Sequence, residues 1–578
     1  MSIFNKKWKF YDSAPADFIN LFPEFSDITK QLLWNRDIKE KTGVSKFFSS
    51  NYSEDLHDPY LLKDIKKAAI RILGAIKKNE SILIYGDYDA DGVCASTLLK
   101  TVLERLGAQS VKVYIPDRHD EGYGMNLEAM EKFVKDRVNL IITVDCGSAN
   151  IGEIEFAQKN GVDVIVTDHH QVLENSNFAY AFINPQRKDD KYPFKGLSGT
   201  TVAFKLTQVL LNEDKKEGGS TNLNLPEGWE KWLLDLVAIS IVTDVMPLID
   251  ENRILLKFGL LVLAKTRRLG IRALMKQARV NINKIDAHTL GFVLGPRLNA
   301  AGRMLHANLA FDLLNSEDFF EAERLAQELE VLNNERRDVV AEIVRDLNKK
   351  EFNKDFAIIE GSESWPIGVL GIAAGRLADK YNKPTFLYQK KHSTLVGSAR
   401  TPELFNTVTI LASSSLYLEK FGGHAQAGGF TALLSNEEHL RDLIKKVSQE
   451  YAEQIGEDKI VPTVKIDAHI NLKDINWDLW DEIERFNPFG EGNLKPMFLA
   501  ESVCVVSSGM VGQNGNHFRC CVKDTDGNSK KAIGFNFPVT CARIKEGDKL
   551  DIVFNIDLDE WNGNRELSLK LVDIKHHG

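Results

Sequence analysis

The sequence lacks several features that mark common protein classes. It has no apolar run of the roughly 20 residues that a bilayer-spanning helix needs. Its first residues contain neither an apolar core nor a small-residue cleavage site, so we expect no secretory signal. Its six cysteines form no CxxC pair, which predicts reduced thiols and a cytoplasmic protein. Neither GxxxxGKS/T nor GxGxxG occurs in a suitable context, which argues against nucleotide-driven motor chemistry.

The composition is that of an ordinary globular protein. The 578 residues are 43% hydrophobic and 27% charged, which is enough apolar material for several domains. The net charge of −9 gives no global sign of nucleic-acid binding. A basic groove can still lie on an acidic protein, so the charge excludes little.

The chain is organised around residues 81–97, SILIYGDYDADGVCAST. Residues 82–85 are an apolar run bounded by glycine, which predicts a buried strand, and the end of the stretch has the pattern of a helix. Between them lie Asp87, Asp89 and Asp91. Carboxylates this close raise one another's pKa unless a cation binds them. A metal site is therefore one interpretation, and a metal-free surface loop is the other.

Strand and helix patterns alternate on both sides of this stretch. Apolar runs at 111–116, 139–144, 162–167 and 179–184 predict four further strands, and most are separated by helical patterns. This alternation predicts right-handed βαβ units and a parallel sheet.

Polar residues follow the predicted strands. Arg118 comes after the second strand, Asp145 after the third, and Asp168, His169 and His170 after the fourth. The carboxyl ends of parallel strands share one edge of a sheet, where ligands bind. We therefore expect these side chains to gather along one rim with the three aspartates.

A further acid, Asp244, follows an apolar helix-like run, where it is costly unless paired; a helix cap is the alternative. The rim then has more carboxylates than one ion can use, and two ions about 3.5–4 Å apart would accommodate them. Oxygen ligands with an imidazole favour two Mn²⁺ ions, with Mg²⁺ as the other candidate. Such ions would deprotonate a water and clamp a phosphoryl group, so we expect phosphate-ester hydrolysis, with His170 hydrogen-bonding the phosphate or the leaving oxygen. The candidate ligands are Asp87, Asp89, Asp91, Asp145, His169 and Asp244.

The rest of the chain predicts further elements. Residues 316–351 have a long amphipathic helical pattern, either a strut between domains or a plain surface helix with solvated charges. Residues 355–455 are again α/β, and from 462 onward short strands with Gly/Asn turns predict a small β-barrel. Four aromatic residues could stack bases there, although at least half of them belong in the core: Phe518, Phe535, Phe537 and Trp561.

Two segments are candidates for phosphate contacts. In GPRLNAAGR, Arg297, Asn299 and Arg303 suit phosphate oxygens, although the segment could be a structural turn. In the glycine-rich GGHAQAGG, His424 together with Arg400 could grip a phosphate or a sugar, although a lone histidine is more often structural.

Several motifs together resemble a known superfamily. Asp168-His169-His170 with DYDADG and VDCG resembles the DHH phosphoesterases. IPDRHDEGYGMN, GPRLNAAGRM, WPIGVLGIAAGRL, GSAR and GGHAQAGG are similar to one branch of it, the RecJ family of bacterial single-strand-specific exonucleases. The resemblance implies 5′→3′ degradation of single-stranded DNA to mononucleotides in recombination and repair.

The resemblance also implies roles for single residues. Asp87, Asp89 and Asp145 would hold one metal, and Asp91, Asp145, His169 and Asp244 the other. His170, Asp145 and His169 would form the catalytic group. The phosphate and DNA contacts would be Arg118, Asn299, Arg303, Ser398, Arg400 and His424.

The expected architecture is α/β with an OB-like β-barrel. The domains would be an N-terminal arm packed on the next domain, a parallel-sheet DHH domain with a helical extension, a connecting helix, a smaller α/β DHH-associated domain, and an OB-like nucleic-acid-binding domain. Their expected bounds are 1–50, 51–315, 316–352, 353–458 and 459–578. The strut and the barrel would form a ring-like path too narrow for duplex.

The expected partner is single-stranded DNA with a free 5′ end, with a single-stranded-DNA-binding protein and a helicase as protein partners. We expect a monomer that does not bind membranes. Two other hypotheses stay open: a phosphoesterase for small substrates such as oligonucleotides or cyclic dinucleotides, and a non-catalytic nucleic-acid-binding scaffold. The predicted barrel and strut argue against the first, and the complete ligand set argues against the second.

Overall fold

The computed structural model describes residues 2–118, 120–172, 179–216, 225–352, 355–456, 459–513, 515–561 and 564–578, with Trp561 described by its backbone alone. The chain forms two units. One unit contains residues 51–454 and 490–492, and the other contains residues 1–50, 455–489 and 493–578.

The predicted parallel sheet is present in the larger unit. Its strands lie in the order β3-β2-β4-β5-β6, and every pair is parallel. The strands are β2 (Ile82–Gly86), β3 (Val111–Tyr114), β4 (Leu140–Val144), β5 (Asp163–Thr167) and β6 (Ala181–Ile183). Because β2, β4 and β5 are neighbours, the loops that follow them are adjacent at the carboxyl edge.

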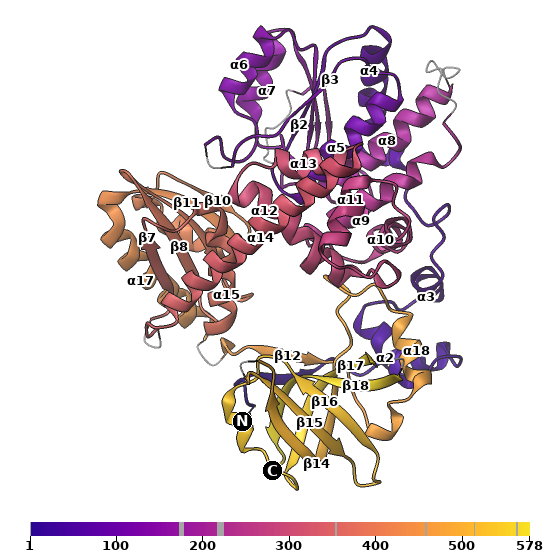
Figure 1. Cartoon of the computed structure of the whole chain (residues 1–578), viewed down its shortest axis with the longest axis vertical. Helices are drawn as coiled ribbons and strands as arrows, with labels where there is room; N and C mark the ends of the chain where they lie inside the picture. The colour runs from indigo at the N-terminus through magenta and orange to yellow at the C-terminus, as the bar shows by residue number, and fades with distance from the viewer. Residues whose placement is uncertain are drawn as a thin grey trace. The chain divides into compact units, whose positions relative to one another are not determined.

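Helices cover both faces of this sheet, as Figure 1 shows. Ile82 and Ile84 point into one core with the helices of one face, and Leu83 and Tyr85 into a second core with those of the other. This alternation is the period of two that a strand imposes on its side chains. The first face carries α4 (Ile65–Lys77), α5 (Ala90–Arg105) and α8 (Gly199–Lys216), and the second carries α6 (Leu127–Lys135) and α7 (Ile151–Lys159).

A helical segment follows the sheet. It contains α9 (Leu234–Thr243), α10 (Asp250–Leu263), α11 (Leu269–Gln277), a π-helical turn at Thr289–Leu294, α12 (Gly295–Met304) and α13 (Asn308–Asn315). Throughout the described ranges, no helix combines the length and the apolarity that crossing a membrane requires.

The long helix expected near residues 316–351 is α14 (Phe319–Leu347). Leu325 and Leu329 lie in the core of the first sheet and its helices, whereas Ile343 and Leu347 lie in the core of the following α/β segment. One helix therefore contributes to two cores.

The second α/β segment has a mixed sheet in the order β10-β11-β9-β8-β7, in which only the β7–β8 pair is parallel among the described strands. Its strands are β7 (Ile358–Ser362), β8 (Thr385–Lys391), β9 (Thr394–Arg400), β10 (Lys420–Gly423) and β11 (Ala427–Leu433). Its helices are α15 (Ile367–Tyr381), α16 (Thr407–Ser413) and α17 (Glu437–Ile455).

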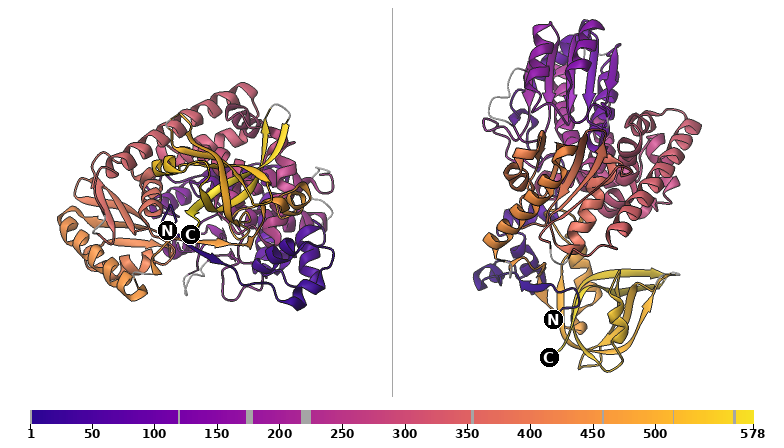
Figure 2. Two further views of the ribbon diagram at one scale, coloured as in Figure 1. Left: turned by 90° about the horizontal axis from the view of Figure 1, so that it is seen from below. Right: turned by 90° about the vertical axis from the view of Figure 1, so that its left-hand side faces the viewer.

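The smaller unit contains the predicted β-barrel. The strands lie in the order β13-β14-β15-β16-β18-β17, and an additional β14–β17 pairing closes the sheet, which the right-hand view of Figure 2 shows as a curled sheet (yellow). The elements are β12 (Thr463–Ile466), β13 (Ala468–His469), α18 (Trp477–Glu484), β14 (Phe498–Val511), β15 (His517–Lys523), β16 (Ser529–Gly534), β17 (Lys549–Trp561) and β18 (Asn564–His576).

The expectation that the N-terminal arm packs on the next domain is wrong. Strand β1 (Lys7–Phe10) pairs in parallel with β12, and Phe22 and Leu33 are buried in the core of the barrel unit. Ser26 and Thr29 both hydrogen-bond to Glu482 on α18. The arm's helices are α1 (Ala16–Leu21), α2 (Asp27–Asn35) and α3 (Lys41–Phe48). The arm therefore belongs to the unit that contains the other end of the chain.

Candidate metal centre

The acidic loop after β2 is fixed by its own helix start. Asp89 is the N-cap of α5, and its Oδ1 accepts hydrogen bonds from the backbone N–H groups of Asp91 (2.9 Å) and Gly92 (3.1 Å). A Cβ at Gly92 would lie 2.5 Å from the carbonyl oxygen of Asp87, so the turn is closed to any larger residue. Oδ2 of Asp89 takes part in neither of these two hydrogen bonds.

Asp91 is held by the N-terminus of α8 and by α9. Its Oδ2 accepts from Gly199 N (2.7 Å), and its Oδ1 accepts from Thr200 N (2.8 Å), Thr200 Oγ1 (2.6 Å) and Ser240 Oγ (2.6 Å). A carboxylate has about four lone-pair sites, two on each oxygen. Oδ1 is saturated, and Oδ2 keeps one lone pair that can face a cation.

Asp145 follows β4 with a left-handed backbone (φ 62°), a conformation that costs free energy for residues other than glycine. Its backbone N–H donates to the Thr167 carbonyl (3.0 Å), which ties it to β5. A Cβ at Gly199 would lie 2.6 Å from the Asp145 carboxylate. The left-handed turn at Asp145 and the missing side chain at Gly199 together leave room for this carboxylate between the loops.

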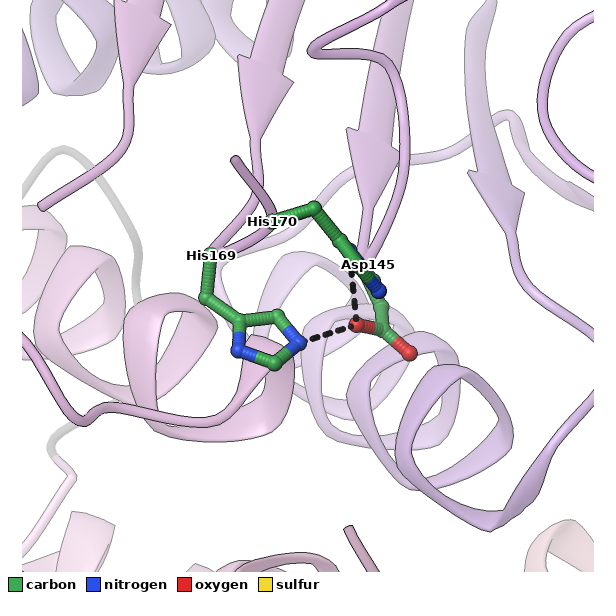
Figure 3. A group of neighbouring side chains, drawn as sticks. All are labelled: Asp145, His169 and His170. Atoms are coloured by element: carbon green, nitrogen blue, oxygen red, sulfur yellow. Dashed lines mark ion pairs between the residues drawn. The ribbon is translucent and has the colours of Figure 1, made fainter. Parts of the chain in front are cut away.

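The two histidines of the Asp168-His169-His170 motif lie beside Asp145 (Figure 3). His169 Nε2 lies 3.1 Å from Asp145 Oδ1 and 3.4 Å from Asp244 Oδ2. Asp168 accepts from the backbone N–H groups of Ser148 (2.9 Å) and His169 (2.7 Å), and its Oδ1 lies 2.8 Å from His170 Nδ1. An ionised carboxylate can only accept, so Nδ1 of His170 carries the proton and Nε2 is the free nitrogen.

These side chains form three overlapping groups whose ligand atoms lie within 4.8 Å of one another. Asp145 belongs to two of them and His169 to two. The groups are Asp87, Asp89 and Asp145; Asp91, His169 and Asp244; and Asp145, His169 and His170.

Four atoms of these groups are buried without a hydrogen-bond partner in the described part of the chain. They are Asp87 Oδ1, Asp145 Oδ1, His169 Nε2 and Asp244 Oδ2. Buried polar atoms are nearly always partnered, because an unpaired one costs about 1–3 kcal/mol. Four such lone pairs that face one another fit the coordination shell of divalent cations such as Mn²⁺ or Mg²⁺.

The electrostatics of the group agree with this fit. Burial and then the charges of the neighbouring aspartates raise the pKa values of Asp87, Asp145 and Asp244 well above the usual range. Burial lowers the pKa of His169, which favours the neutral imidazole that can bind a metal. A cation removes the repulsion that raises the three carboxyl pKa values.

His170 differs from His169. Burial lowers its pKa, but the hydrogen bond and the charge of Asp168 outweigh burial and raise the pKa of His170 to about 9. Tyr123 Oη also lies 3.0 Å from His170 Nδ1 and 3.4 Å from the Asp145 carbonyl oxygen. Because Asp168 accepts from Nδ1 and the raised pKa keeps both ring nitrogens protonated near neutral pH, Nε2 of His170 is a hydrogen-bond donor.

Three of the predicted phosphate-binding arginines converge beside this group. Arg303 on α12 donates through Nη1 to the Gly368 carbonyl (3.0 Å), and Arg118 stacks over the Tyr88 ring (4.7 Å). Burial and then the charge of Arg118 lower the pKa of Arg303 to about 9, and the same two causes lower the pKa of Arg400. Three guanidinium groups this close to one another suit an anion.

The other predicted contacts have clear places in the fold. Arg400 Nη1 donates to Ser398 Oγ (3.1 Å) on β9. His424 is exposed in the turn between β10 and β11, and Ala427 on β11 pairs with Arg400. Asn299 Oδ1 accepts from Ala90 N (2.8 Å), so this amide also holds the acidic loop.

The segment GPRLNAAGR is a helix, and its interpretation as a structural turn is wrong. Residues Gly295–Met304 form α12, with Pro296 in the first turn, where a missing N–H costs nothing. A Cβ at Gly302 would lie 2.4 Å from the Tyr88 carbonyl oxygen. Gly302 therefore allows the helix to pack closely against the acidic loop.

Three residues that support the site were missed as functional by the sequence reasoning. Ser240 and Thr200 bind Asp91, and Asp168 binds His170. Asp168 stood in the recognised motif and could have been assigned this role. Ser240 and Thr200 lie in largely apolar helical patterns that give no signal.

The fold and the site define a phosphoesterase of the DHH class. Residues 81–241 match the DHH family, N-terminal domain; residues 353–453 match the DHHA1 domain; and residues 466–573 match the RecJ OB domain. The acids and histidines at the strand ends all lie within the first of these ranges, and Asp244, the C-cap of α9, lies just beyond it.

The particular family follows from whole-chain comparisons. The single-stranded-DNA-specific exonuclease RecJ of Haemophilus influenzae is 31% identical over 530 residues, which are 89% of this chain and 91% of that protein. The Bacillus subtilis RecJ is 35% identical over 92% of this chain, but the chain covers only 65% of that relative. The crystal structure of Thermus thermophilus RecJ with Mn²⁺ matches with a TM-score of 0.84 and 25% identity, over 99% of this chain and 80% of that one. The chain belongs to the RecJ family of single-stranded-DNA-specific exonucleases.

Proposed function

We propose that the protein is a 5′→3′ exonuclease that hydrolyses single-stranded DNA to mononucleotides with two divalent metal ions, in recombination and repair. The observation that carries the proposal is the set of four buried, unpartnered ligand atoms on Asp87, Asp145, His169 and Asp244. The names of the relatives supply the substrate class.

The residues divide between two ions in this proposal. Asp87, Asp89 and Asp145 would hold one ion, and Asp91, Asp145, His169 and Asp244 the other, which agrees with two of the three geometric groups. Bound divalent ions would supply a nucleophile at neutral pH and would neutralise the charge of the phosphate. The imidazole nitrogen of His169 favours Mn²⁺ over Mg²⁺.

His170 is proposed as a hydrogen-bond donor to the phosphate or the leaving oxygen. Its Nδ1 is bound to Asp168, which fixes the ring and leaves Nε2 to donate. Asp168 itself is a positioning residue, because its carboxylate contacts Ser148, His169 and His170.

The proposed phosphate grip consists of Arg118, Arg303 and Arg400. Charge-assisted bonds from guanidinium groups are about twice as strong as neutral ones and match phosphate oxygens geometrically. Ser398 and His424 would close the site from the second α/β segment, and Asn299 would act near it through the acidic loop.

The proposed partner is a single strand with a free 5′ end. Such a substrate needs opened duplex, so a helicase and a single-stranded-DNA-binding protein are the proposed protein partners. Every proposed ligand comes from one chain, which supports action as a monomer. We place the activity in the cytoplasm, where bacterial chromosomal DNA is found.

The experiment is digestion of end-labelled single-stranded and duplex DNA with Mn²⁺, Mg²⁺ or chelator. We expect mononucleotides released from the 5′ end of the single strand, and no digestion in chelator. Asp145→Ala should abolish digestion while single-strand binding is retained. Digestion from the 3′ end, preference for a dinucleotide over a long strand, or inactivity of the wild type with Mn²⁺ would each overturn the proposal.

A further inference from the structure

The connecting helix α14 carries an arginine that is only partly solvated. Arg336 lies on the half of α14 that packs against α15, where Val340 and Ile343 meet Val369 and Leu370. Its Nη2 donates to the buried Asn333 Oδ1 (2.9 Å), whereas its Nε is buried without a hydrogen-bond partner in the described part of the chain. A buried guanidinium N–H without an acceptor is expensive, so the position needs an explanation.

The charges around Arg336 are positive. Burial and then the charges of Arg376 on α15, Arg337 and Arg297 lower its pKa. Arg297 is neutralised by two contacts to Glu330 (2.5 and 3.1 Å). Arg336, Arg337 and Arg376 have no ion-pair partner among the described residues. Arg337 and Arg376 are exposed, so their charges are accessible to an anion, whereas the buried Nε of Arg336 lacks an acceptor among the described residues.

This cluster continues the phosphate grip at the metal centre. Burial, Arg118 and then Arg336 lower the pKa of Arg303, so the charge of Arg336 acts on one arginine of the grip. Helix α15 links the two places: a Cβ at Gly368 would lie 2.1 Å from the Arg303 carbonyl oxygen, and one at Gly371 would lie 2.7 Å from Arg400 Nη2. Arg376 lies on the same helix, further along.

We propose that Arg336, with Arg376 and Arg337, forms a second phosphate subsite at the junction of α14 and α15, which binds a phosphodiester group of the substrate strand other than the one held by Arg118, Arg303 and Arg400. The proposal rests on the proposed function, because it takes the strand as the ligand. The occupant is a backbone phosphate, since guanidinium groups read phosphate without regard to base.

The subsite makes binding depend on strand length. A substrate too short to reach Arg336 gains nothing from it, and a longer strand gains one charge-assisted contact. The connecting helix is then part of the substrate path as well as of two cores, and its arginines act on binding before the chemical step.

The test compares Arg336→Gln with two matched variants on the same helix. Arg336→Lys keeps the charge, and Arg324→Gln removes a charge that Glu321 (2.8 Å) and Glu328 (2.9 Å) already neutralise. Binding of an unstructured oligodeoxythymidylate is measured in chelator at several salt concentrations. Loss of one phosphate contact should weaken binding roughly 10- to 100-fold and reduce the slope of log K against log salt by about 0.7.

Kinetics on a ladder of substrates from a dinucleotide upward give the second readout. We expect Arg336→Gln to raise KM only for strands beyond a threshold length, with kcat unchanged, and Arg336→Lys to restore most of the salt slope. An unchanged salt slope, the same loss in Arg324→Gln, or a loss already on the dinucleotide would overturn the subsite. Those outcomes leave wild-type digestion intact, whereas a wild type that neither binds nor digests the strand would overturn the proposed function itself. A melting curve of each variant identifies misfolding.

Discussion

Nδ1 of His170 lies 2.8 Å from Oδ1 of Asp168, and the same carboxylate accepts from the backbone N–H groups on both sides of the turn. Asp168→Asn keeps the shape but removes the negative charge that raises the pKa of His170, so the ring becomes a neutral imidazole near neutral pH. If the amide oxygen of Asn still accepts from Nδ1, the one remaining proton stays on Nδ1 and Nε2 loses its donor role. We expect kcat on single-stranded DNA to fall roughly 10- to 100-fold, as for other residues that orient an active-site histidine. The measurement is single-turnover digestion with Mn²⁺.

Binding of the strand in chelator is the control for Asp168→Asn, because Asp168 makes no hydrogen bond or ion pair in the described structure to Arg118, Arg303 or Arg400, which form the proposed phosphate grip. An unchanged kcat in a folded variant would show that the reaction needs no proton on Nε2 of His170.

Ser240→Ala tests the support of Asp91. The Ser240 hydroxyl is fully buried and donates to Asp91 Oδ1 (2.6 Å), so its removal frees that oxygen from one of its three bonds. We expect Mn²⁺ affinity to fall roughly 10- to 100-fold. Titration calorimetry with Mn²⁺ in the absence of DNA measures this directly.

Thr207→Val is the matched control for Ser240→Ala. It removes a fully buried hydroxyl that donates to the Ala203 carbonyl (3.0 Å) within α8. If both variants lose the same metal affinity, the effect comes from general loosening of the helices and the specific role of Ser240 is wrong.

The rim of acids and histidines could be predicted from sequence because it depends on topology alone. Asp87, Asp145 and His169 follow strands that are neighbours in a parallel sheet, and such strands end at one edge whatever their side chains are. The strand bounds agree with the predicted runs to within two residues.

Contacts that depend on three-dimensional packing could not be predicted. The arm at residues 1–50 has no clear hydrophobic period, and its partner Glu482 lies more than 450 residues further along the chain than Ser26. In the same way, the sequence shows a glycine at 302 but not the Tyr88 carbonyl that it approaches. Long-range packing of this kind leaves no local pattern.

We expect the metal-free centre to lower the stability of the fold. Asp145 is buried among like charges without a hydrogen-bond partner for Oδ1 among the described residues, so the metal-free site repels itself. We expect Asp145→Asn to melt at or above the wild-type temperature in chelator, but to lose the stabilisation by Mn²⁺. For the wild type this stabilisation is about 2.7 kcal/mol at a free ion concentration 100 times Kd.

Thermal unfolding with and without Mn²⁺ measures both the melting temperature of the metal-free protein and its stabilisation by the ion. Asp379→Asn, which changes an exposed acid on α15, is the control and should keep the full gain. A lower melting temperature of Asp145→Asn in chelator would contradict the repulsion argument.

A buried ion pair supports the helical segment. Lys205 Nζ lies 2.6 Å from Glu251 Oε2, both side chains are fully buried, and Tyr192 donates to Glu251 Oε1 (2.6 Å). Lys205→Met leaves the carboxylate unpaired and should lower the free energy of unfolding by about 3–5 kcal/mol. The double variant Lys205→Met/Glu251→Leu should recover most of this loss in urea denaturation, and a loss equal to the sum of the single variants would contradict the pairing.

The barrel aromatics separate into core and surface. Phe518 is fully buried and Phe537 is 4% exposed, so both belong to the core, whereas Phe535 is 48% exposed; the side chain of Trp561 lies outside the described residues. Lys570 Nζ lies over the Phe535 ring, 5.6 Å from its centre, which places a cation next to this exposed ring. We expect Phe535→Ala to weaken single-strand binding by about 1–3 kcal/mol, the value of one stacked base, with stability unchanged. Phe518→Ala should instead cost about 3–5 kcal/mol of unfolding free energy, because it leaves a cavity. Fluorescence anisotropy in chelator and urea denaturation measure the two quantities, and equal binding by Phe535→Ala and the wild type would remove this ring from the DNA path.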